Sequence, residues 1–171
     1  MTRHFALLAC TLALTACAST GSGPRAVAQL QSISGSTATG TVNFVQTGDK
    51  VTVSGTVRGL KANAEHGFHL HEKGDCSSAD GMSAGGHFNP GSKPHGSQAD
   101  MNHHAGDLPS LKADASGVAT FSFTSQAITV GSGVSDIVGR AVIVHRDPDD
   151  YTTQPTGNSG PRLACAVIVR D

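Results

Sequence analysis

The arrangement of the histidines is the sequence feature that most constrains how this chain can fold. Six of the nine histidines, joined by one aspartate, follow a regular pattern of His69-x-His71, His87, His95, His104, Asp107 and His145. Imidazole and carboxylate groups are metal ligands, and seven of them are too many for one tetrahedral ion. If His87 bridges, the groups divide into two four-coordinate sites, and the fold has to bring all of these positions together.

Much of the remaining chain has the pattern of short β-strands separated by turn residues. Apolar and polar residues alternate well over 41–45 and 51–57, and Thr47-Gly48-Asp49-Lys50 between them predicts a hairpin turn. Further strands are expected over 25–33, 67–72, 118–124, 140–146 and 163–170. Helical patterns are absent, and 21 glycines and 7 prolines supply turns. The sequence therefore predicts an antiparallel, all-β sandwich or barrel.

The segment 73–106 has no strand or helix pattern. A loop of this length in a compact domain usually has a function, and three of the candidate ligands lie inside it, with Asp107 at its end. Metal binding, with a disulfide at Cys76, can order such a segment in place of a backbone ladder. A second irregular segment, 147–161, follows His145.

The first residues have the pattern of an export signal. Arg3 and His4 precede an apolar run over 5–14 that is too short to span a bilayer as a helix. We therefore expect residues 1–16 to be a signal peptide that is removed from the mature protein. Its removal takes away Arg3 and no acidic residue, so the formal net charge moves from −1 to −2.

The residues around Cys17 predict a lipid anchor. Leu14-Thr15-Ala16-Cys17 resembles the lipobox of bacterial lipoproteins, which is cut before the cysteine, whose thiol is then acylated. An ordinary signal cleaved at Ala16-Cys17-Ala18 is the alternative. The small residues up to 24 form a flexible tether, so that 17–24 links the anchor to a domain over 25–171. We expect an exported protein of the periplasm or cell envelope, and Ala18 favours the outer membrane.

Nothing in the composition indicates a nucleic-acid partner. The chain has no basic stripe, and aromatic residues, which would stack on bases, are 4% of the sequence.

Two of the four cysteines fall inside the expected domain. Cys10 lies in the signal and Cys17 at the lipid site, which leaves Cys76 and Cys165. In an exported protein such a pair most simply forms one disulfide, and two buried free thiols are the alternative. The disulfide would close a loop of about 90 residues and add about 4–5 kcal/mol of stability in the chain-entropy account.

The His-x-His motif is weak evidence when it is taken alone. Alternate side chains of a strand share a face, so His69 and His71 point together while Phe68 and Leu70 face the core. A surface or structural role is the better explanation of such a pair on its own, and a lone histidine such as His145 at the end of a strand is also weak evidence. The metal hypothesis depends on all of the positions together.

Taken together, the motifs resemble copper/zinc superoxide dismutase. The resemblance covers roughly residues 27–170 and is strongest over 65–170. The segments that carry it, in the order and spacing of the family, are Gly67-Phe68-His69-Leu70-His71-Glu72, Gly86-His87-Phe88-Asn89-Pro90, His95-Gly96, His104-Ala105-Gly106-Asp107-Leu108, Gly139-Arg140-Ala141-Val142-Ile143-Val144-His145 and Gly160-Pro161-Arg162-Leu163-Ala164-Cys165.

The resemblance implies two adjoining metal sites on an eight-stranded, immunoglobulin-like Greek-key β-barrel or sandwich with a long metal-binding loop. The positions that match the copper ligands are His69, His71, His87 and His145. The positions that match the zinc ligands are His87, His95, His104 and Asp107, so that His87 bridges the metals as an imidazolate. Four nitrogens suit Cu(II), and three imidazoles with a carboxylate suit Zn(II).

The resemblance also implies a reaction, the disproportionation of superoxide to oxygen and hydrogen peroxide by Cu(II)/Cu(I) cycling. In this mechanism His87 leaves copper and takes up a proton on reduction, while zinc holds His87 and shapes the loop. Asp149 matches a carboxylate that links a copper histidine to a zinc histidine. Arg162 matches the cation above copper that attracts the anion. Cys76 and Cys165 match the intramolecular disulfide, which would help to hold Arg162.

Two histidines are not assigned by the family pattern in a simple way. His103 precedes His104 and offers a second register for the zinc ligand, but the spacing of three residues to Asp107 favours His104. His66 matches no ligand, and we expect it to make a structural hydrogen bond.

The second loop departs from the pattern of eukaryotic members. After Asp150 it has no Lys or Glu before Arg162, so steering of the substrate beyond Arg162 has to come from elsewhere, with Lys73 and Lys93 as candidates. Lys73 also stands where eukaryotic dimers tend to place an interface aromatic residue. This difference argues against a homodimer of the eukaryotic type, and a homodimer is kept only as an alternative.

We expect an exported, lipid-anchored copper/zinc superoxide dismutase with one copper and one zinc ion per subunit. A non-catalytic copper/zinc-binding module on the same fold is the alternative, but it predicts a lost bridge, a lost zinc ligand or no Arg162, and all are present. A structural or adhesion domain would have no reason to keep seven ligands in register. A cysteine–histidine hydrolase would need a free reactive thiol.

Overall fold

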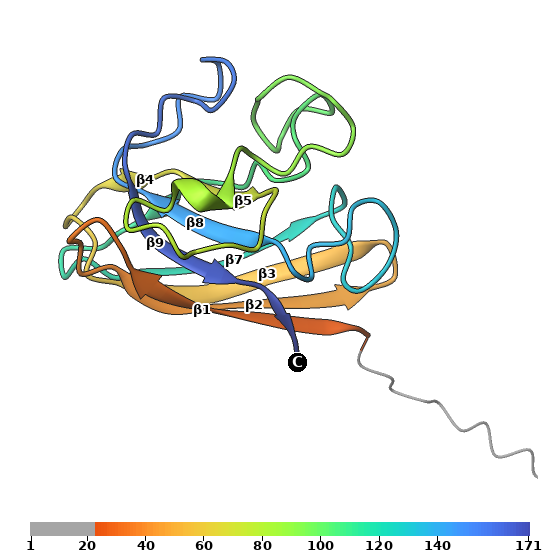
Figure 1. The fold of residues 1–171 in the computed structure, drawn as a ribbon, viewed down its shortest axis with the longest axis horizontal. Coiled ribbons are helices and arrows are strands. Elements are labelled where there is room, and N and C mark those ends of the chain that lie inside the picture. Colours follow the sequence, from red (N-terminus) through yellow and green to blue (C-terminus); the bar gives the residue numbers. More distant parts are fainter. Residues whose placement is uncertain (1–22) are drawn as a thin grey trace, which may run out of the picture.

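Ten β-strands and one turn of 3-10 helix form the regular structure of residues 23–171, the part of the chain that the computed structural model describes (Figure 1). The elements are β1 (Arg25–Ser32), β2 (Thr39–Thr47), β3 (Lys50–Arg58), β4 (Glu65–His66), β5 (Phe68–His71), η1 (Met82–Ala84), β6 (Leu111–Lys112), β7 (Ala119–Ser125), β8 (Ala141–His145), β9 (Arg162–Val167) and β10 (Val169–Arg170). This composition confirms the predicted all-β class.

Eight of the strands form one curled antiparallel sheet. Its order is β5-β8-β9-β1-β2-β3-β7, with β10 paired to β1, while β4 and β6 form a separate two-stranded ladder. Neighbours in the sheet come from distant parts of the sequence, as where β1 lies between β2 and β9. The architecture agrees with the predicted Greek-key barrel with one disulfide.

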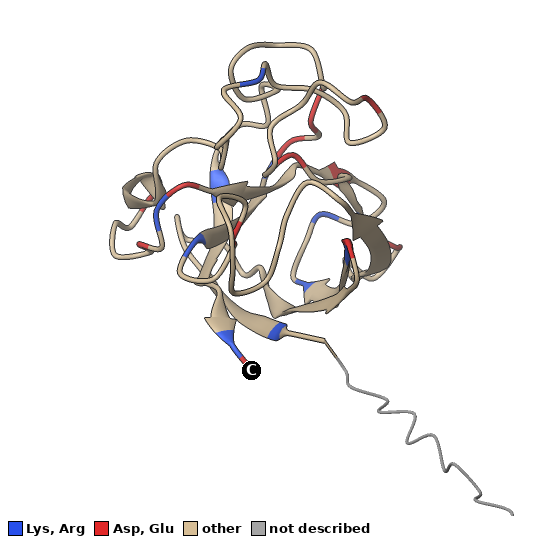
Figure 2. Ribbon diagram, turned by 90° about the vertical axis from the view of Figure 1, so that its right-hand side faces the viewer, with Lys and Arg blue, Asp and Glu red and all other residues tan. Residues whose placement is uncertain are grey.

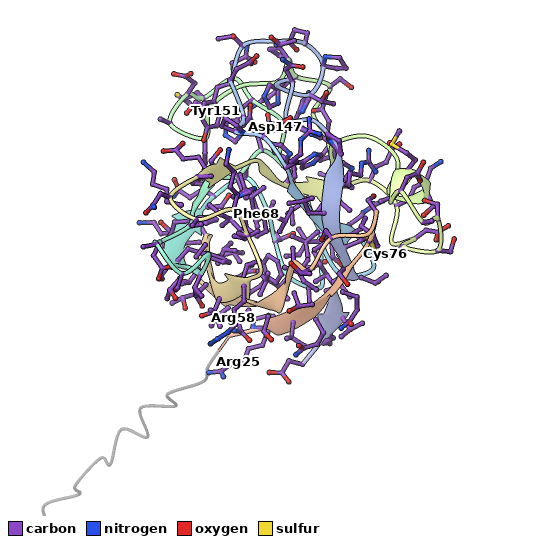
Figure 3. All side chains as sticks on the ribbon, turned by 90° about the vertical axis from the view of Figure 1, so that its left-hand side faces the viewer. Arg25, Arg58, Phe68, Cys76, Asp147 and Tyr151 are labelled. Atoms are coloured by element: carbon purple, nitrogen blue, oxygen red, sulfur yellow. A yellow bond between two sulfur atoms is a disulfide. The ribbon has the colours of Figure 1, made fainter. Side chains whose placement is uncertain are left out.

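The sheet is stabilised by the alternating residues that predicted it. In the β2–β3 hairpin, Val42 and Phe44 are buried, as are Val51 and Val53 on the neighbouring strand, while their polar neighbours face outward. Burial of such side chains contributes about 1.5–3 kcal/mol each. Phe68 lies inside the barrel, where its ring packs edge-on against Phe121 with centroids 5.3 Å apart (Figure 3).

The sequence pattern missed two short strands and joined two others. β4 and β6 have two residues each, too few for an alternation to be visible. The strand expected over 163–170 divides at Ile168, because Ile168 N donates to Arg140 O (2.8 Å) and Ile168 O accepts from Gly139 N (2.8 Å). β9 therefore pairs with β8, whereas β10 pairs with the other end of β1.

Two long loops lie on the same side of the sheet, the upper side in Figure 1. The first runs from β5 to β6. The sequence predicted no strand or helix between residues 73 and 106, and the structure has one short element there, the helical turn η1. The second joins β8 to β9. The first loop contains four of the seven candidate ligands, and the second contains Asp149.

A disulfide joins Cys76 in the first loop to Cys165 in β9 (Figure 3 labels Cys76), with the two Cα atoms 5.8 Å apart. This bond confirms the predicted pairing. It links the start of the irregular segment to a buried strand of the sheet.

Basic and acidic residues are interspersed over the ribbon (Figure 2). Within residues 23–171, no helix is long and apolar enough to cross a membrane. The expected signal peptide, the lipid site at Cys17 and most of the tether lie outside the described residues.

Candidate metal centre

Strand β5 places the first two histidines of the cluster. It pairs with β8 so that His69 lies opposite Ile143 and His71 opposite Ala141. Its free edge is covered by the first loop, because Leu70 N donates to Gly106 O (2.9 Å) and Leu70 O accepts from Phe88 N (2.8 Å). The loop is thereby held beside β5 at two points.

This loop pairing brings distant ligands to the strand. His87 lies opposite His71, and Asp107 lies opposite His69, in isolated antiparallel bridges. His145 follows a register shift at the end of β8, where its N–H donates to Gly67 O (2.8 Å).

Four buried histidines form the first cluster, with one ring nitrogen of each within 4.8 Å of the others. They are His69, His71, His87 and His145. Each has a buried ring nitrogen without a hydrogen-bond partner among residues 23–171, namely His69 Nδ1, His71 Nε2, His87 Nε2 and His145 Nε2. Buried polar atoms are almost always paired, so four unpaired nitrogens around one point fit a metal ion that accepts their lone pairs.

The other ring nitrogens of this cluster are fixed by acceptors. His71 Nδ1 donates to Gly85 O (2.9 Å) and His145 Nδ1 donates to Gly160 O (3.2 Å). His69 Nε2 lies 2.6 Å from Asp149 Oδ2. Because the protons are held at these positions, the unpaired nitrogens carry lone pairs toward the centre.

Burial favours the neutral form of three of these histidines. It lowers the pKa of His71 and of His145 well below the usual range, and it lowers the pKa of His87 to about 4. Neutral imidazole is the form that binds a metal, so these low pKa values favour metal binding over protonation.

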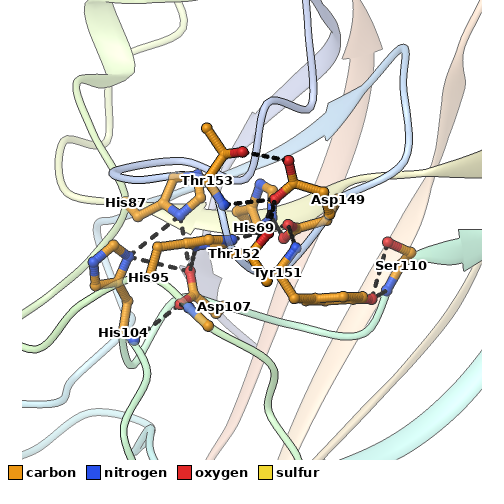
Figure 4. A network of polar contacts seen from close by, with 12 residues as sticks. His69, His87, His95, His104, Asp107, Ser110, Asp149, Tyr151, Thr152 and Thr153 are labelled. Carbon is orange, nitrogen blue, oxygen red and sulfur yellow. Dashed lines mark hydrogen bonds and ion pairs between the residues drawn. The ribbon is translucent and has the colours of Figure 1, made fainter.

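Asp107 organises the second cluster, which consists of His87, His95, His104 and Asp107. Its Oδ2 accepts hydrogen bonds from Gly96 N (3.0 Å) and His104 N (2.9 Å), which fix the carboxylate. Its Oδ1 faces three ring nitrogens, the Nδ1 atoms of His87 (2.8 Å), His95 (3.0 Å) and His104 (3.2 Å) (Figure 4).

These spacings fit a tetrahedral ion. With ligand distances of about 2.0–2.1 Å, a tetrahedron has edges of about 3.3 Å. The Nδ1 atoms of His87 and His104 are 3.4 Å apart, and the carboxylate oxygen lies 2.8–3.2 Å from the three nitrogens. Three imidazoles and one carboxylate are a donor set that zinc prefers.

The two carboxylates beside His95 favour a positive charge there. Burial by itself lowers the pKa of His95, but hydrogen bonds to Asp107 and Asp149 outweigh it and raise the pKa to about 9. Burial alone would raise the pKa values of both carboxyl groups. Hydrogen bonds with the neighbouring histidines outweigh it and hold the pKa of Asp107 and that of Asp149 well below their usual range.

Asp149 lies between the two clusters. Its Oδ2 contacts His69 Nε2 at 2.6 Å, and its Oδ1 contacts His95 Nε2 at 2.9 Å (Figure 4). Tyr151 N donates to Oδ1 (2.7 Å) and completes the orientation of the carboxylate. One histidine from each cluster is thereby linked through a single side chain.

The second loop also holds the first loop through residues that sequence reasoning missed. Gln154 pairs with the backbone of His95, accepting from His95 N (2.8 Å) and donating to His95 O (2.9 Å). The Tyr151 hydroxyl accepts from Ser110 N (3.0 Å). A single polar residue in an irregular segment has no sequence signal that would have indicated either contact.

The two remaining histidines have structural contacts. His103 belongs to neither cluster, and its Nδ1 donates to His104 O (2.6 Å), so the ligand register falls on His104. His66 Nδ1 donates to His145 O (2.9 Å), the kind of hydrogen bond expected for it.

A cavity of about 500 Å³ opens beside the first cluster. Its lining includes His71, His87, His145 and Arg162. The Arg162 guanidinium donates to Gly81 O (2.6 Å) and Gly85 O (2.7 Å), which fixes it at the wall. Lys73 and Lys93 do not line this cavity, and Lys93 Nζ donates to Met101 O (2.8 Å).

Replacement of Gly157 by alanine should damage the link between the clusters. Gly157 has φ +66°, and a Cβ atom there would clash with Asp149 Oδ1 and lie 2.5 Å from His95 Nε2. Gly48→Ala is the matched control, because Gly48 has φ +60° with nothing within 4 Å of the new atom. We expect about 1–2 kcal/mol of destabilisation from backbone strain in the control. Gly157→Ala should lose more free energy of unfolding than the control, measured by denaturant unfolding, and should bind zinc more weakly, measured by chelator competition. Equal losses of stability in the two variants would contradict the clash.

Fold and site together define a β-barrel metalloprotein with two adjoining metal positions that share one imidazole. Residues 38–168 match the copper/zinc superoxide dismutase (SODC) family. The chain belongs to this family. The cofactors of this family are copper and zinc, and the two ligand sets suit these two metals.

Two known proteins illustrate the similarity. Superoxide dismutase (Cu-Zn) 2 of Brassica juncea is 48% identical over 136 residues, which cover 75% of this chain and 88% of the relative. The crystal structure of the clock protein EA4 superimposes with a TM-score of 0.78 at 40% identity, covering 87% of this chain and 96% of that one.

Proposed function

We propose that this protein disproportionates superoxide to oxygen and hydrogen peroxide, with copper held by the four-histidine cluster and zinc by the cluster around Asp107. The observation that carries the proposal is the position of His87. Its unpaired Nε2 belongs to the first cluster, while its Nδ1 lies 2.8 Å from Asp107 Oδ1 in the second. A shared imidazole of this kind suits a paired centre, and family membership supports the reaction.

Copper, when bound, would supply the exchange of one electron with superoxide in each half of the reaction. The side chains supply position and a proton. His87 is held at Nδ1 on the zinc side, so Nε2 is the atom that can take up a proton and present it to the cavity. Asp149 keeps the rings of His69 and His95 in place meanwhile.

Arg162 would bind and orient the anion. Arginine remains charged at neutral pH, and two carbonyl groups fix this side chain in the wall of the cavity that the copper ligands line. Because Arg162 is three residues from Cys165, the disulfide also restrains its backbone.

Substitution of this cation should slow the reaction without removing the metals. We expect Arg162→Ala to lower kcat/KM for superoxide about tenfold and to reduce its dependence on ionic strength. Arg146→Ala is the control, since Arg146 is exposed and, within the described part of the chain, its side chain pairs with Asp147 alone. Pulse radiolysis at two salt concentrations measures both effects. Equal values of kcat/KM for the two variants would show that Arg162 does not contribute to substrate binding.

The proposed reaction is tested by its stoichiometry. Protein loaded with copper and zinc should consume two superoxide ions for each oxygen and each hydrogen peroxide formed, at a rate proportional to protein concentration. A protein that binds both metals in full without turnover would instead be a copper/zinc-binding module, the alternative that the family match does not favour.

We also propose a bacterial, exported protein attached to the membrane through a lipid on Cys17. The support is the sequence alone, an apolar run that ends in Leu14-Thr15-Ala16-Cys17. The mass of the mature amino terminus tests this proposal, and a chain that starts elsewhere or carries no acyl group would contradict it. Sedimentation velocity tests whether the protein forms a homodimer.

A further inference from the structure

One methionine lies at the rim of the cavity that leads to the four-histidine cluster. Met82, in the helical turn η1, is 60% exposed and lines the same cavity as His71, His87 and His145. These three histidines are buried, and each has an unpaired Nε2. The cavity therefore offers a thioether on the solvent side and imidazole lone pairs at the inner end.

Two charged side chains of opposite sign line the cavity and affect the entry of a cation. Arg162 is fixed in the wall, and its positive charge repels any approaching cation. The other formally charged side chain of the lining is Asp80, which lies two residues before Met82. The carboxylate and the thioether are thus close together in the sequence and line the same cavity.

The donor type at this rim distinguishes between metals. Thioether sulfur is a soft ligand that selects Cu(I), whereas zinc is served by imidazole and carboxylate groups. Among the residues of the zinc cluster, only the shared His87 lines this cavity. A soft donor at the rim would therefore favour Cu(I) at this entrance.

From this arrangement we infer that Met82 and Asp80 form a transient entry site for Cu(I), which passes from the thioether to the imidazoles of His71, His87 and His145. The inference rests on the proposed assignment of copper to the four-histidine cluster. Asp80 offsets the charge of Arg162 during the transfer, and Met82 provides the first coordinating atom. The entry site does not alter the final ligands. It therefore affects the rate of copper loading but not the final copper content.

The kinetic test compares two exposed methionines. Met82→Leu removes the thioether and keeps an apolar side chain of similar size. Met101→Leu is the matched control, because Met101 is 93% exposed and lies outside this cavity. Zinc-loaded, copper-free protein is mixed without oxygen with Cu(I) bound to bicinchoninate, and loss of the chelate's absorbance reports transfer. We expect Met82→Leu to slow transfer roughly tenfold, Asp80→Asn to slow it as well, and Met101→Leu to match the parent, with equal final copper contents.

A binding measurement identifies the sulfur directly. The chain has three methionines, and silver(I) is a redox-inert probe with the same charge as Cu(I) and a similar preference for sulfur. In protein labelled with ¹³C at the methionine methyl groups, silver(I) should shift the Met82 resonance and leave that of Met101 in place. Equal transfer rates for the two leucine variants, or equal shifts of the two methyl groups, would overturn the entry site. A parent that takes up no copper at all would overturn the copper assignment as well.

Discussion

Replacement of His145 by alanine should abolish superoxide dismutation, with a loss of more than about a thousandfold in kcat/KM. The substitution removes one of the four unpaired nitrogens of the first cluster and also the ring that is fixed by Gly160 O. It leaves the second cluster intact, because His145 is not part of it. We therefore expect the variant to bind zinc normally, to bind copper weakly and to turn over no superoxide.

His103→Asn provides the control for this experiment. His103 is buried and lies next to the zinc-cluster residue His104, but it belongs to neither cluster, and an asparagine amide can still donate a hydrogen bond as His103 Nδ1 does. This variant should keep both metals and the rate of the parent. Metal contents by mass spectrometry and superoxide decay by stopped flow decide the matter. A copper-replete, fully active His145→Ala protein would exclude His145 from the copper site.

Loss of the disulfide should produce the largest effect on stability. Cys76 and Cys165 are 89 residues apart, and a cross-link of that span lowers the entropy of the unfolded chain by the equivalent of about 4–5 kcal/mol. The double variant Cys76→Ser/Cys165→Ser should lose about that much free energy of unfolding, which is a large part of the stability of a typical domain. It should also lose activity, because the bond connects β9, where Arg162 lies, to the loop whose carbonyls hold Arg162.

Reduction of the parent protein separates the bond from the serine substitutions. Urea unfolding of the parent in a phosphine reductant should approach the curve of the double variant, while the double variant should not respond to the reductant. A parent that unfolds at the same urea concentration with and without reductant would show that the disulfide does not stabilise the fold.

The hairpin and the ligands were predictable from sequence for different reasons. Val42 and Phe44 alternate with polar residues because one face of their strand is buried, so a period of two is visible over a few residues. The ligands were visible because imidazoles are rare and their spacing matched a family. In the structure, their far-apart positions converge through loop contacts to β5, such as Phe88 N to Leu70 O.

Other features had no local signal. The two-residue strands β4 and β6 depend on pairing between distant segments, and a pattern cannot form in two positions. Gln154 looks like any polar loop residue until its amide is seen against the backbone of His95. Gly157 is one of 21 glycines, and the atoms that exclude a Cβ there belong to other parts of the fold. Such roles depend on which loops contact each other in the folded protein, and local sequence propensity does not determine these contacts.

The position of Asp149 has a thermodynamic consequence for metal binding. Because one carboxylate contacts His69 of the first cluster and His95 of the second, and because His87 belongs to both, occupation of one metal position changes the free energy of binding at the other. Linkage makes this coupling reciprocal. Whatever factor zinc imposes on the affinity for copper, copper imposes on the affinity for zinc, so neither affinity is a fixed property of its own four ligands.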